Sequence, residues 1–144
     1  MTAHWVLDTS VVLKWTRRDE ILADRALALL TAYLNGLAQI TVPVLLAYEV
    51  ANVLRYKTDL ATGDIEVAVQ ALFDLDLTWA TPTAAVMRRA VWLAREYDTT
   101  VYDATFAAMA ETVDADFVTA DERLARRLAA LPLVQFLGDV EIAQ

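Results

Sequence analysis

The stretch His4-Trp5-Val6-Leu7-Asp8-Thr9-Ser10 decides the fold. Its apolar, β-prone residues end abruptly at a carboxylate, which two hydroxyl residues follow. This pattern predicts a buried strand of a parallel sheet, in which both faces are covered and most residues are apolar. Open α/β sheets bind their ligands at the carboxyl ends of the strands, and Asp8 is expected at that edge. The stretch therefore predicts an α/β fold and a first functional residue together.

Short strands and helices alternate along the rest of the chain. Apolar residues at helical spacing predict helices at 21–35, 43–57, 64–74, 83–97, 100–113 and 121–131. Short β-prone runs predict strands at 39–42, 77–79, 115–119 and, at a sheet edge, 134–137. Pro43 is expected in the first turn of its helix, and Gly36 at the end of the helix before it. The order predicts a single α/β domain over 1–144, with helices on both faces of a parallel sheet of four to five short strands.

Composition and charge exclude several classes of function. The 144 residues are 58% hydrophobic, but charged residues interrupt every helix-like stretch, so no run approaches the ~18–20 apolar residues of a membrane span. No secretory signal precedes the first strand, which predicts a cytoplasmic protein. The absence of cysteine excludes disulfides, thiolate zinc sites and thiol nucleophiles. The single histidine, His4, is expected to be structural or exposed.

The net charge of −8 argues against binding nucleic acid over the whole surface. It is compatible with a locally basic groove, and it suits a basic protein partner. The candidates for holding an RNA backbone are Lys14, Arg17, Arg18, Arg55 and Lys57. Each of them fits a solvated surface charge or a helix-end complement equally well.

Three further acidic residues stand where they suit a site shared with Asp8. Glu49 interrupts an otherwise apolar helix, where an unpaired buried carboxylate is costly. Asp103 lies in the first turn of its helix, and Asp121 follows the fourth strand. Each aspartate also has a structural interpretation: Asp8 as a helix cap, Asp103 as a capping-box acid and Asp121 as an acid favoured by the helix dipole.

Convergence of these four acids at one sheet edge would require a cation. Two carboxylates ~5 Å apart repel by roughly 3 kcal/mol at an effective dielectric of ~20. Oxygen ligands without histidine or cysteine favour Mg²⁺ or Mn²⁺ over zinc, and such an ion activates water and neutralises charge on a phosphate. A serine–histidine–aspartate arrangement lacks a suitable histidine, and no glycine-rich phosphate loop is present. The residues therefore predict a metal centre that hydrolyses phosphodiester bonds.

Four short motifs, taken in order, resemble those of the PIN-domain nucleases, and most closely the VapC-type toxins of bacterial and archaeal toxin–antitoxin pairs. They are Val6-Leu7-Asp8-Thr9-Ser10, Tyr48-Glu49-Val50-Ala51-Asn52-Val53-Leu54, Val101-Tyr102-Asp103-Ala104 and Val118-Thr119-Ala120-Asp121. Each motif alone is weakly specific, but their order and spacing cover nearly the whole chain. The resemblance implies a three-layer α/β/α PIN-like fold and a Mg²⁺- or Mn²⁺-dependent endoribonuclease that cleaves RNA with a metal-activated water.

The resemblance also implies roles for individual residues and the identity of partners. The family's site corresponds to the metal-binding acids Asp8, Glu49, Asp103 and Asp121, the supporting hydroxyls Ser10 and Thr119, and the polar Asn52 beside the glutamate. It implies a homodimer, a cognate VapB-type antitoxin that covers the active groove, and tRNA, rRNA or mRNA as the substrate. Arg123 is a departure, because some relatives carry a further acid or asparagine there, and it leaves the choice between one and two metals open.

Two apolar features have alternative interpretations. Trp15 is either a residue that stacks on a base or, as its type favours, a core or interface residue. The apolar stripe of the helix at 21–35, with Tyr33 and Leu37, is wider than one core contact requires. It either faces a partner or belongs to a deeply buried helix.

Three competing functions stay open. A phosphotransferase of the haloacid-dehalogenase type also has an aspartate after its first strand, but it requires a second aspartate where Ser10 stands. A non-catalytic PIN-like interaction module is disfavoured because all four acids are present. A housekeeping RNA-processing nuclease would share the chemistry, whereas the small size and the lack of an RNA-binding appendage favour the toxin.

Overall fold

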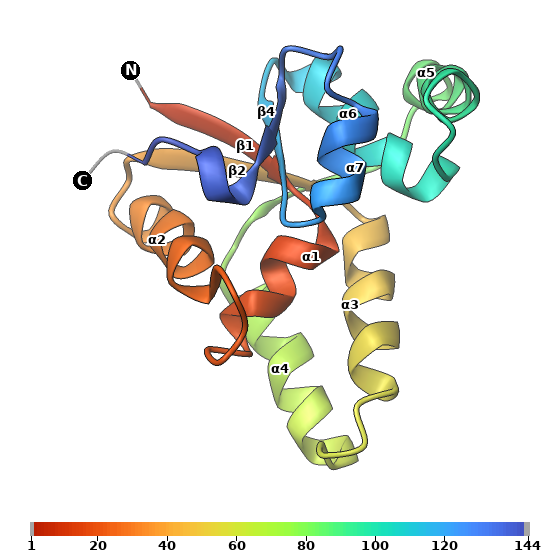
Figure 1. Cartoon of the computed structure of the whole chain (residues 1–144). Helices are drawn as coiled ribbons and strands as arrows, with labels where there is room; N and C mark the ends of the chain where they lie inside the picture. Colours follow the sequence, from red (N-terminus) through yellow and green to blue (C-terminus); the bar gives the residue numbers. More distant parts are fainter. Residues whose placement is uncertain (1, 143–144) are drawn as a thin grey trace.

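The computed structural model describes residues 2–142 of the chain (Figure 1). They form a five-stranded sheet with the strand order β3-β2-β1-β4-β5, in which every neighbouring pair is parallel. The strands are β1 (Ala3–Leu7), β2 (Ala38–Pro43), β3 (Thr78–Ala80), β4 (Asp116–Thr119) and β5 (Val134–Phe136). β1 is the central strand, so the opening stretch of the sequence is the middle of the sheet. The predicted α/β class and parallel sheet are confirmed.

Helices cover both faces of this sheet (Figure 1). They are α1 (Thr9–Val12), α2 (Ala23–Leu34), α3 (Leu45–Arg55), α4 (Thr62–Asp74), α5 (Ala84–Glu96), α6 (Val101–Val113) and α7 (Glu122–Arg127), with 3₁₀ turns at η1 (Leu13–Trp15) and η2 (Leu137–Asp139). α6 packs across β1, β2 and β4, and α5 packs against α6. α3 and α4 extend together away from the sheet (Figure 1). Within residues 2–142, no helix is both long and apolar enough to cross a membrane.

The most buried helix, α6, is the one that carries Asp103. Every residue from 104 to 110 is buried, on all sides of the helix. The rings of Phe106 and Phe117 stack with their centroids 6.1 Å apart, which joins α6 to β4. Full burial of one such side chain contributes about 1.5–3 kcal/mol. The start of α6 is therefore held firmly over the carboxyl ends of the central strands.

Pro43 belongs to a strand, and the prediction that it begins a helix was wrong. It is the last residue of β2 and is paired with Ala80, while α3 begins two residues later at Leu45. The backbone N–H of Val44 donates to the carbonyl of Ala80 at 3.1 Å. Since the neighbouring residue makes this bond, the missing N–H of proline is tolerated at the strand end.

Two predicted helices also have different bounds in the structure. The helix predicted at 21–35 begins at Ala23, because Leu22 has a left-handed backbone with φ 67°, and it ends at Leu34. Gly36, with φ 76°, stands just beyond the helix as expected. α7 ends at Arg127 rather than at 131, and turns and a bend lead from there to β5.

Candidate active site

Asp8 follows β1 and is only 5% exposed. Its Oδ1 accepts a hydrogen bond from Ser10 Oγ at 2.5 Å, and its Oδ2 accepts one from Thr119 Oγ1 at 2.6 Å. The backbone N–H of Val11 also donates to Oδ1, so Asp8 caps α1 as the structural interpretation expected. Burial raises the pKa of Asp8 to about 6, although these hydrogen bonds oppose the rise. Asp8 is therefore a buried carboxylate whose donors are all neutral.

The hydroxyls of Ser10 and Thr119 connect Asp8 to the loop after β4. Because each hydroxyl donates its only proton to Asp8, its oxygen is free to accept. Ser10 Oγ accepts from the backbone N–H of Ala120 at 2.8 Å, and Thr119 Oγ1 accepts from the backbone N–H of Asp121 at 3.1 Å. Two acids that are more than a hundred residues apart in sequence are thus tied together by two hydroxyl side chains.

Glu49 lies on α3 with its side chain half-buried. Its Oε1 accepts a hydrogen bond from Thr9 Oγ1 at 2.8 Å. Burial raises the pKa of Glu49, and the negative charge of Asp103 raises it further. The partner that a glutamate in an apolar helix requires is therefore a hydroxyl of α1.

Asp103 lies within electrostatic range of the other three acids. Burial and the charge of Asp121 raise the pKa of Asp103, while its own charge raises the pKa of both Asp8 and Glu49. The backbone N–H of Asp103 donates to Thr100 Oγ1 at 3.0 Å, which caps α6. Asp103 is the common electrostatic neighbour in this group of acids.

Asp121 is exposed and caps α7 by accepting a hydrogen bond from the backbone N–H of Leu124 at 3.1 Å. Together with Asp103 it lines an open cavity of about 430 Å³. Hydroxyl and guanidinium groups complete the wall, which also contains Asp98, Thr99, Thr100, Arg123, Leu124 and Arg127. Asp103 and Asp121 therefore border a space that is open to a ligand.

The four acids do not form a closed cage. Within residues 2–142, no three acidic or histidine side chains are grouped closely enough to enclose a metal ion. The donor set nevertheless fits a hard divalent cation, because it consists of carboxylate oxygens that no lysine or arginine of the described chain neutralises. Mg²⁺ usually keeps several waters and takes one or two carboxylates from the protein, so three converging acids are not required.

Two of the predicted RNA-binding residues form ion pairs within the protein. Lys14 Nζ lies 3.5 Å from Glu20, and Arg17 binds both carboxylate oxygens of Asp59 at 2.8 and 3.0 Å. Arg18 is exposed on the same loop. Lys14 and Arg17 thus act as paired surface charges, which is the alternative to RNA binding that the sequence left open.

Of the three other candidates, Asn52 and Arg55 lie on α3, and Lys57 follows its C-terminal cap. The guanidinium of Arg55 lies 4.6 Å from the centroid of the Tyr56 ring. Lys57 and Asn52 are exposed, and within residues 2–142 the Asn52 side chain forms no hydrogen bond with Glu49. Asn52 therefore shares a helix with Glu49 without positioning its carboxylate.

Trp15 and His4 have structural contacts. Trp15 Nε1 donates to the carbonyl of Ala26 at 2.8 Å, and its ring packs against the core. His4 Nε2 is hydrogen-bonded to Thr41 Oγ1 at 2.8 Å. The core interpretation of Trp15 and the structural interpretation of His4 are confirmed.

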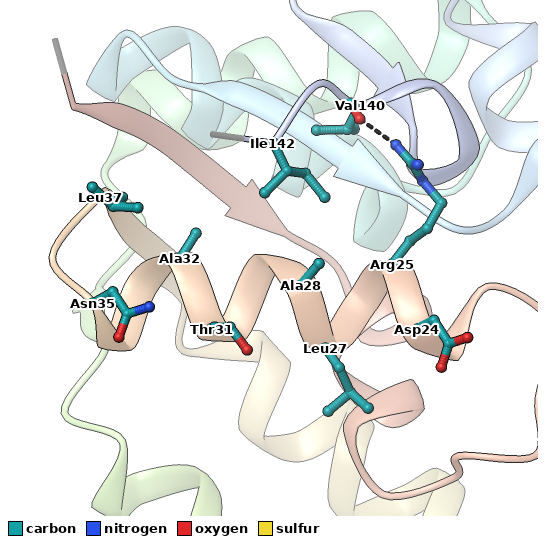
Figure 2. A pocket seen from close by; sticks show the side chains of 10 residues that line it. All are labelled: Asp24, Arg25, Leu27, Ala28, Thr31, Ala32, Asn35, Leu37, Val140 and Ile142. Atoms are coloured by element: carbon teal, nitrogen blue, oxygen red, sulfur yellow. Dashed lines mark hydrogen bonds between the residues drawn. The ribbon is translucent and has the colours of Figure 1, made fainter. Parts of the chain in front are cut away.

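A larger cavity, of about 670 Å³, lies away from the four acids, between α2 and the C-terminal segment (Figure 2). Its wall is mainly aliphatic and includes Leu27, Leu37 and Ile142. Arg25 extends from α2 to the backbone carbonyls of Leu137 and Val140, as Figure 2 shows for the latter. The guanidinium of Arg25 is therefore already bonded to the protein.

Two residues beside the acids were not predicted to act in the site. Thr9, which binds Glu49, is forty residues away in sequence, and no local pattern indicates this pairing. Arg123 was noted as a departure from the family pattern but not as a ligand-binding residue. The sequence does contain a signal for a role of Arg123. It stands two residues after Asp121, in the first turn of a helix that begins at the sheet edge.

Comparison with known proteins identifies the family. The family model described as the PIN domain matches residues 5–130, and the chain therefore belongs to the PIN-domain family. No protein with a curated description matches the sequence.

Several solved structures share the fold. A toxin–antitoxin complex from Klebsiella pneumoniae is 16% identical, with a TM-score of 0.65 over 94% of this chain and 98% of that one. VapBC2 from Rickettsia felis, bound to a DNA fragment from its promoter, is 13% identical, with a TM-score of 0.69 over 92% and 96%. VapC20 from Mycobacterium tuberculosis, described as a sarcin–ricin loop cleaving toxin, is 14% identical, with a TM-score of 0.65 over 85% and 93%. At these identities the likeness concerns the fold.

Proposed function

We propose that this protein is a metal-dependent endoribonuclease and the toxin of a type II toxin–antitoxin pair, with the whole chain as one PIN domain. The observation that carries the proposal is the group of acids around Asp103, to which the described chain supplies no neutralising cation. Membership of the PIN-domain family supports a nuclease. The likeness in fold to toxin–antitoxin complexes and to an RNA-cleaving toxin supports the finer assignment.

In the proposed site, Asp8 and Asp103 would hold the principal Mg²⁺ or Mn²⁺, and Glu49 and Asp121 would bind it directly or through water. The ion, when bound, activates water for attack on phosphorus and balances the charge that develops on the phosphate. Asp8 must be anionic to take part, and its two hydroxyl donors favour the anion.

The remaining residues of the site orient the acids. Ser10 and Thr119 fix both oxygens of Asp8, and Thr9 orients Glu49 through its hydroxyl. Thr100 holds the first turn of α6, and with it Asp103. Since water is the nucleophile, the 2′-hydroxyl of the substrate is not needed for the reaction, and a preference for RNA must come from the groove.

The proposed partners follow from the same assignment. The substrate is tRNA, rRNA or mRNA, the protein acts in the cytoplasm as a homodimer, and a VapB-type antitoxin covers the groove. The outer part of α2 is our candidate for the antitoxin surface, because Leu34 is 62% exposed and the adjoining Leu37 is 39% exposed. A small neighbouring reading frame that encodes a DNA-binding protein would favour the toxin over a housekeeping nuclease.

The test is cleavage of a pool of tRNA and rRNA by the purified protein with Mg²⁺ or Mn²⁺. The matched controls are EDTA and the substitutions Asp8→Asn and Asp116→Asn, because Asp116 lies at the opposite end of β4 from the four acids. We expect discrete fragments from the wild type and from Asp116→Asn, and none with EDTA or from Asp8→Asn. Absence of cleavage by a folded wild-type protein freed of antitoxin would favour the non-catalytic module instead.

A further inference from the structure

We infer that Arg123 binds a phosphate of the RNA strand beside the four acids and so positions the strand for cleavage. This inference rests on the proposed function. Arg123 is the second residue of α7 and lines the cavity of about 430 Å³ that Asp103 and Asp121 border. It is a cationic side chain in the wall of the space where the substrate would lie.

The register of α7 directs Arg123 toward this cavity. Leu124 is buried and anchors the helix on the core. Arg123 and Arg127 are four residues apart, and therefore lie on one face of the helix; both line the cavity. Arg126 pairs with Glu122 at 3.3 Å, and it is not part of the cavity wall.

Arg123 is also free to bind a ligand. Within residues 2–142 its guanidinium forms no ion pair and no hydrogen bond, whereas Arg127 donates to the carbonyl of Asp98 and lies 3.7 Å from its carboxylate. Asp103 and Asp121 line the same cavity, and within the described residues neither of them forms an ion pair with Arg123. Of the two arginines in the cavity wall, Arg127 is bonded to Asp98, and Arg123 has no such partner within the described residues.

A phosphodiester suits this arrangement better than other ligands. A guanidinium presents paired donors that match the oxygens of a phosphate. The hydroxyls of Thr99 and Thr100 lie in the same cavity wall, where both are hydrogen-bonded to Asp103. Asp103 and Asp121 would repel a phosphate beside them, in a protein whose net charge is −8, and Arg127 in the same wall is already paired with Asp98. Arg123 offsets that repulsion on the side of the site that α7 forms.

The test measures binding of a short, labelled single-stranded RNA by fluorescence anisotropy, in EDTA, across a range of salt concentrations. The variants are Arg123→Gln and, as the matched control, Arg126→Gln, which removes the same charge from the same helix. We expect Arg123→Gln to weaken binding about fivefold or more at low salt and to reduce the slope of log affinity against log salt by about 0.7, the value for one phosphate contact on a single strand. Arg126→Gln should stay within about twofold of the wild type, since Glu122 already neutralises that side chain.

Steady-state cleavage with Mg²⁺ provides a second readout. A residue that only positions the strand should raise KM about fivefold or more in Arg123→Gln with a much smaller change in kcat, and Arg123→Lys should restore part of the loss. Equal losses in the two glutamine variants, or no loss in either, would overturn the inference while leaving the proposed nuclease intact. A wild-type protein that neither binds nor cleaves RNA would instead overturn the proposed function, and this inference with it.

Discussion

Asp8 serves the proposed function at the expense of stability. Its pKa is about 6 in the folded protein, against 3.8 for a free aspartate, because burial disfavours the anion. A carboxyl whose pKa is raised on folding stabilises the fold only when protonated. Its contribution is fully present below about pH 4 and is lost as the pH rises through about 6. At neutral pH the metal-free protein therefore keeps a destabilising charge at the end of its central strand.

Asp8→Asn should stabilise the metal-free protein at about pH 8 by on the order of 2 kcal/mol, and the gain should vanish near about pH 4. Asparagine keeps the cap of α1, and the hydroxyl of Thr119 can donate to Ser10 Oγ, 3.3 Å away. Urea unfolding in EDTA at several pH values measures the effect. The exposed Asp121, changed to asparagine, serves as the control and should show a smaller gain, limited to relief of its repulsion with Asp103; a gain from Asp8→Asn that is equal at every pH would contradict the explanation by burial.

Thr119→Val should have the opposite effect. Thr119 is fully buried, and its hydroxyl both donates to Asp8 and accepts from the backbone of Asp121. Loss of a partner from buried polar groups costs about 1–3 kcal/mol. Because the donor favours the anion of Asp8, the loss should be larger above about pH 6 than below about pH 4.

The control for this substitution is Thr112→Val. Thr112 is exposed and donates only to the carbonyl of Ala108 within its own helix. It should change the free energy of unfolding by less than about 0.5 kcal/mol. If both valine variants lose the same stability at every pH, Thr119 acts through packing alone.

At the scale of elements, helix starts position the acids. Thr100 caps α6 through the backbone N–H of Asp103, and Thr83 caps α5 in the same way through Val86. Each threonine replaced by alanine should lower stability by about 1 kcal/mol. Only Thr100→Ala should also slow RNA cleavage, since it loosens the turn that carries Asp103. Equal cleavage rates in the two variants would show that the cap of α6 does not position the acid.

The sequence predicts these elements well where local chemistry decides them. The helix starts predicted at 83 and 100 and the stop at Gly36 rest on local signals, and the structure has the caps Thr83 and Thr100 and the left-handed Gly36 at these positions. Pro43 was misplaced because its tolerance depends on Val44 making the bond to β3, a contact that the local pattern does not contain. The helix predicted to end at 131, directly before Pro132, ends at Arg127, and no glycine or proline marks that position in the sequence.

At the scale of the whole molecule, the sequence indicates which acids belong to the site but not how tightly they meet. Asp8 and Asp121 follow strands, so the parallel order brings them to one edge, and two hydroxyls do connect them. The bond between Thr9 and Glu49, and the open spacing of the acids, depend on how α1, α3 and α6 pack. Such contacts join residues distant in sequence, and hydrophobic periodicity carries no information on them.

The acidic character of the molecule leads to a last prediction, on metal binding without RNA. An ion that binds only the folded state stabilises it by about 2.7 kcal/mol at a hundred times its Kd. Thermal unfolding with Mg²⁺ should therefore occur several degrees higher than in EDTA at matched ionic strength. Asp103→Asn should abolish this shift, because Asp103 is the acid whose charge interacts with those of the other three.

A divalent ion also screens the repulsion within a protein of net charge −8, so the control must separate screening from binding. Asp116→Asn removes the same charge at the opposite end of β4, where Asp116 is hydrogen-bonded to Gln135 at 3.0 Å. It should leave the Mg²⁺ shift unchanged. If both asparagine variants retain the shift, or if monovalent salt reproduces it, the ion acts on the charge of the whole molecule and the four acids do not form its site.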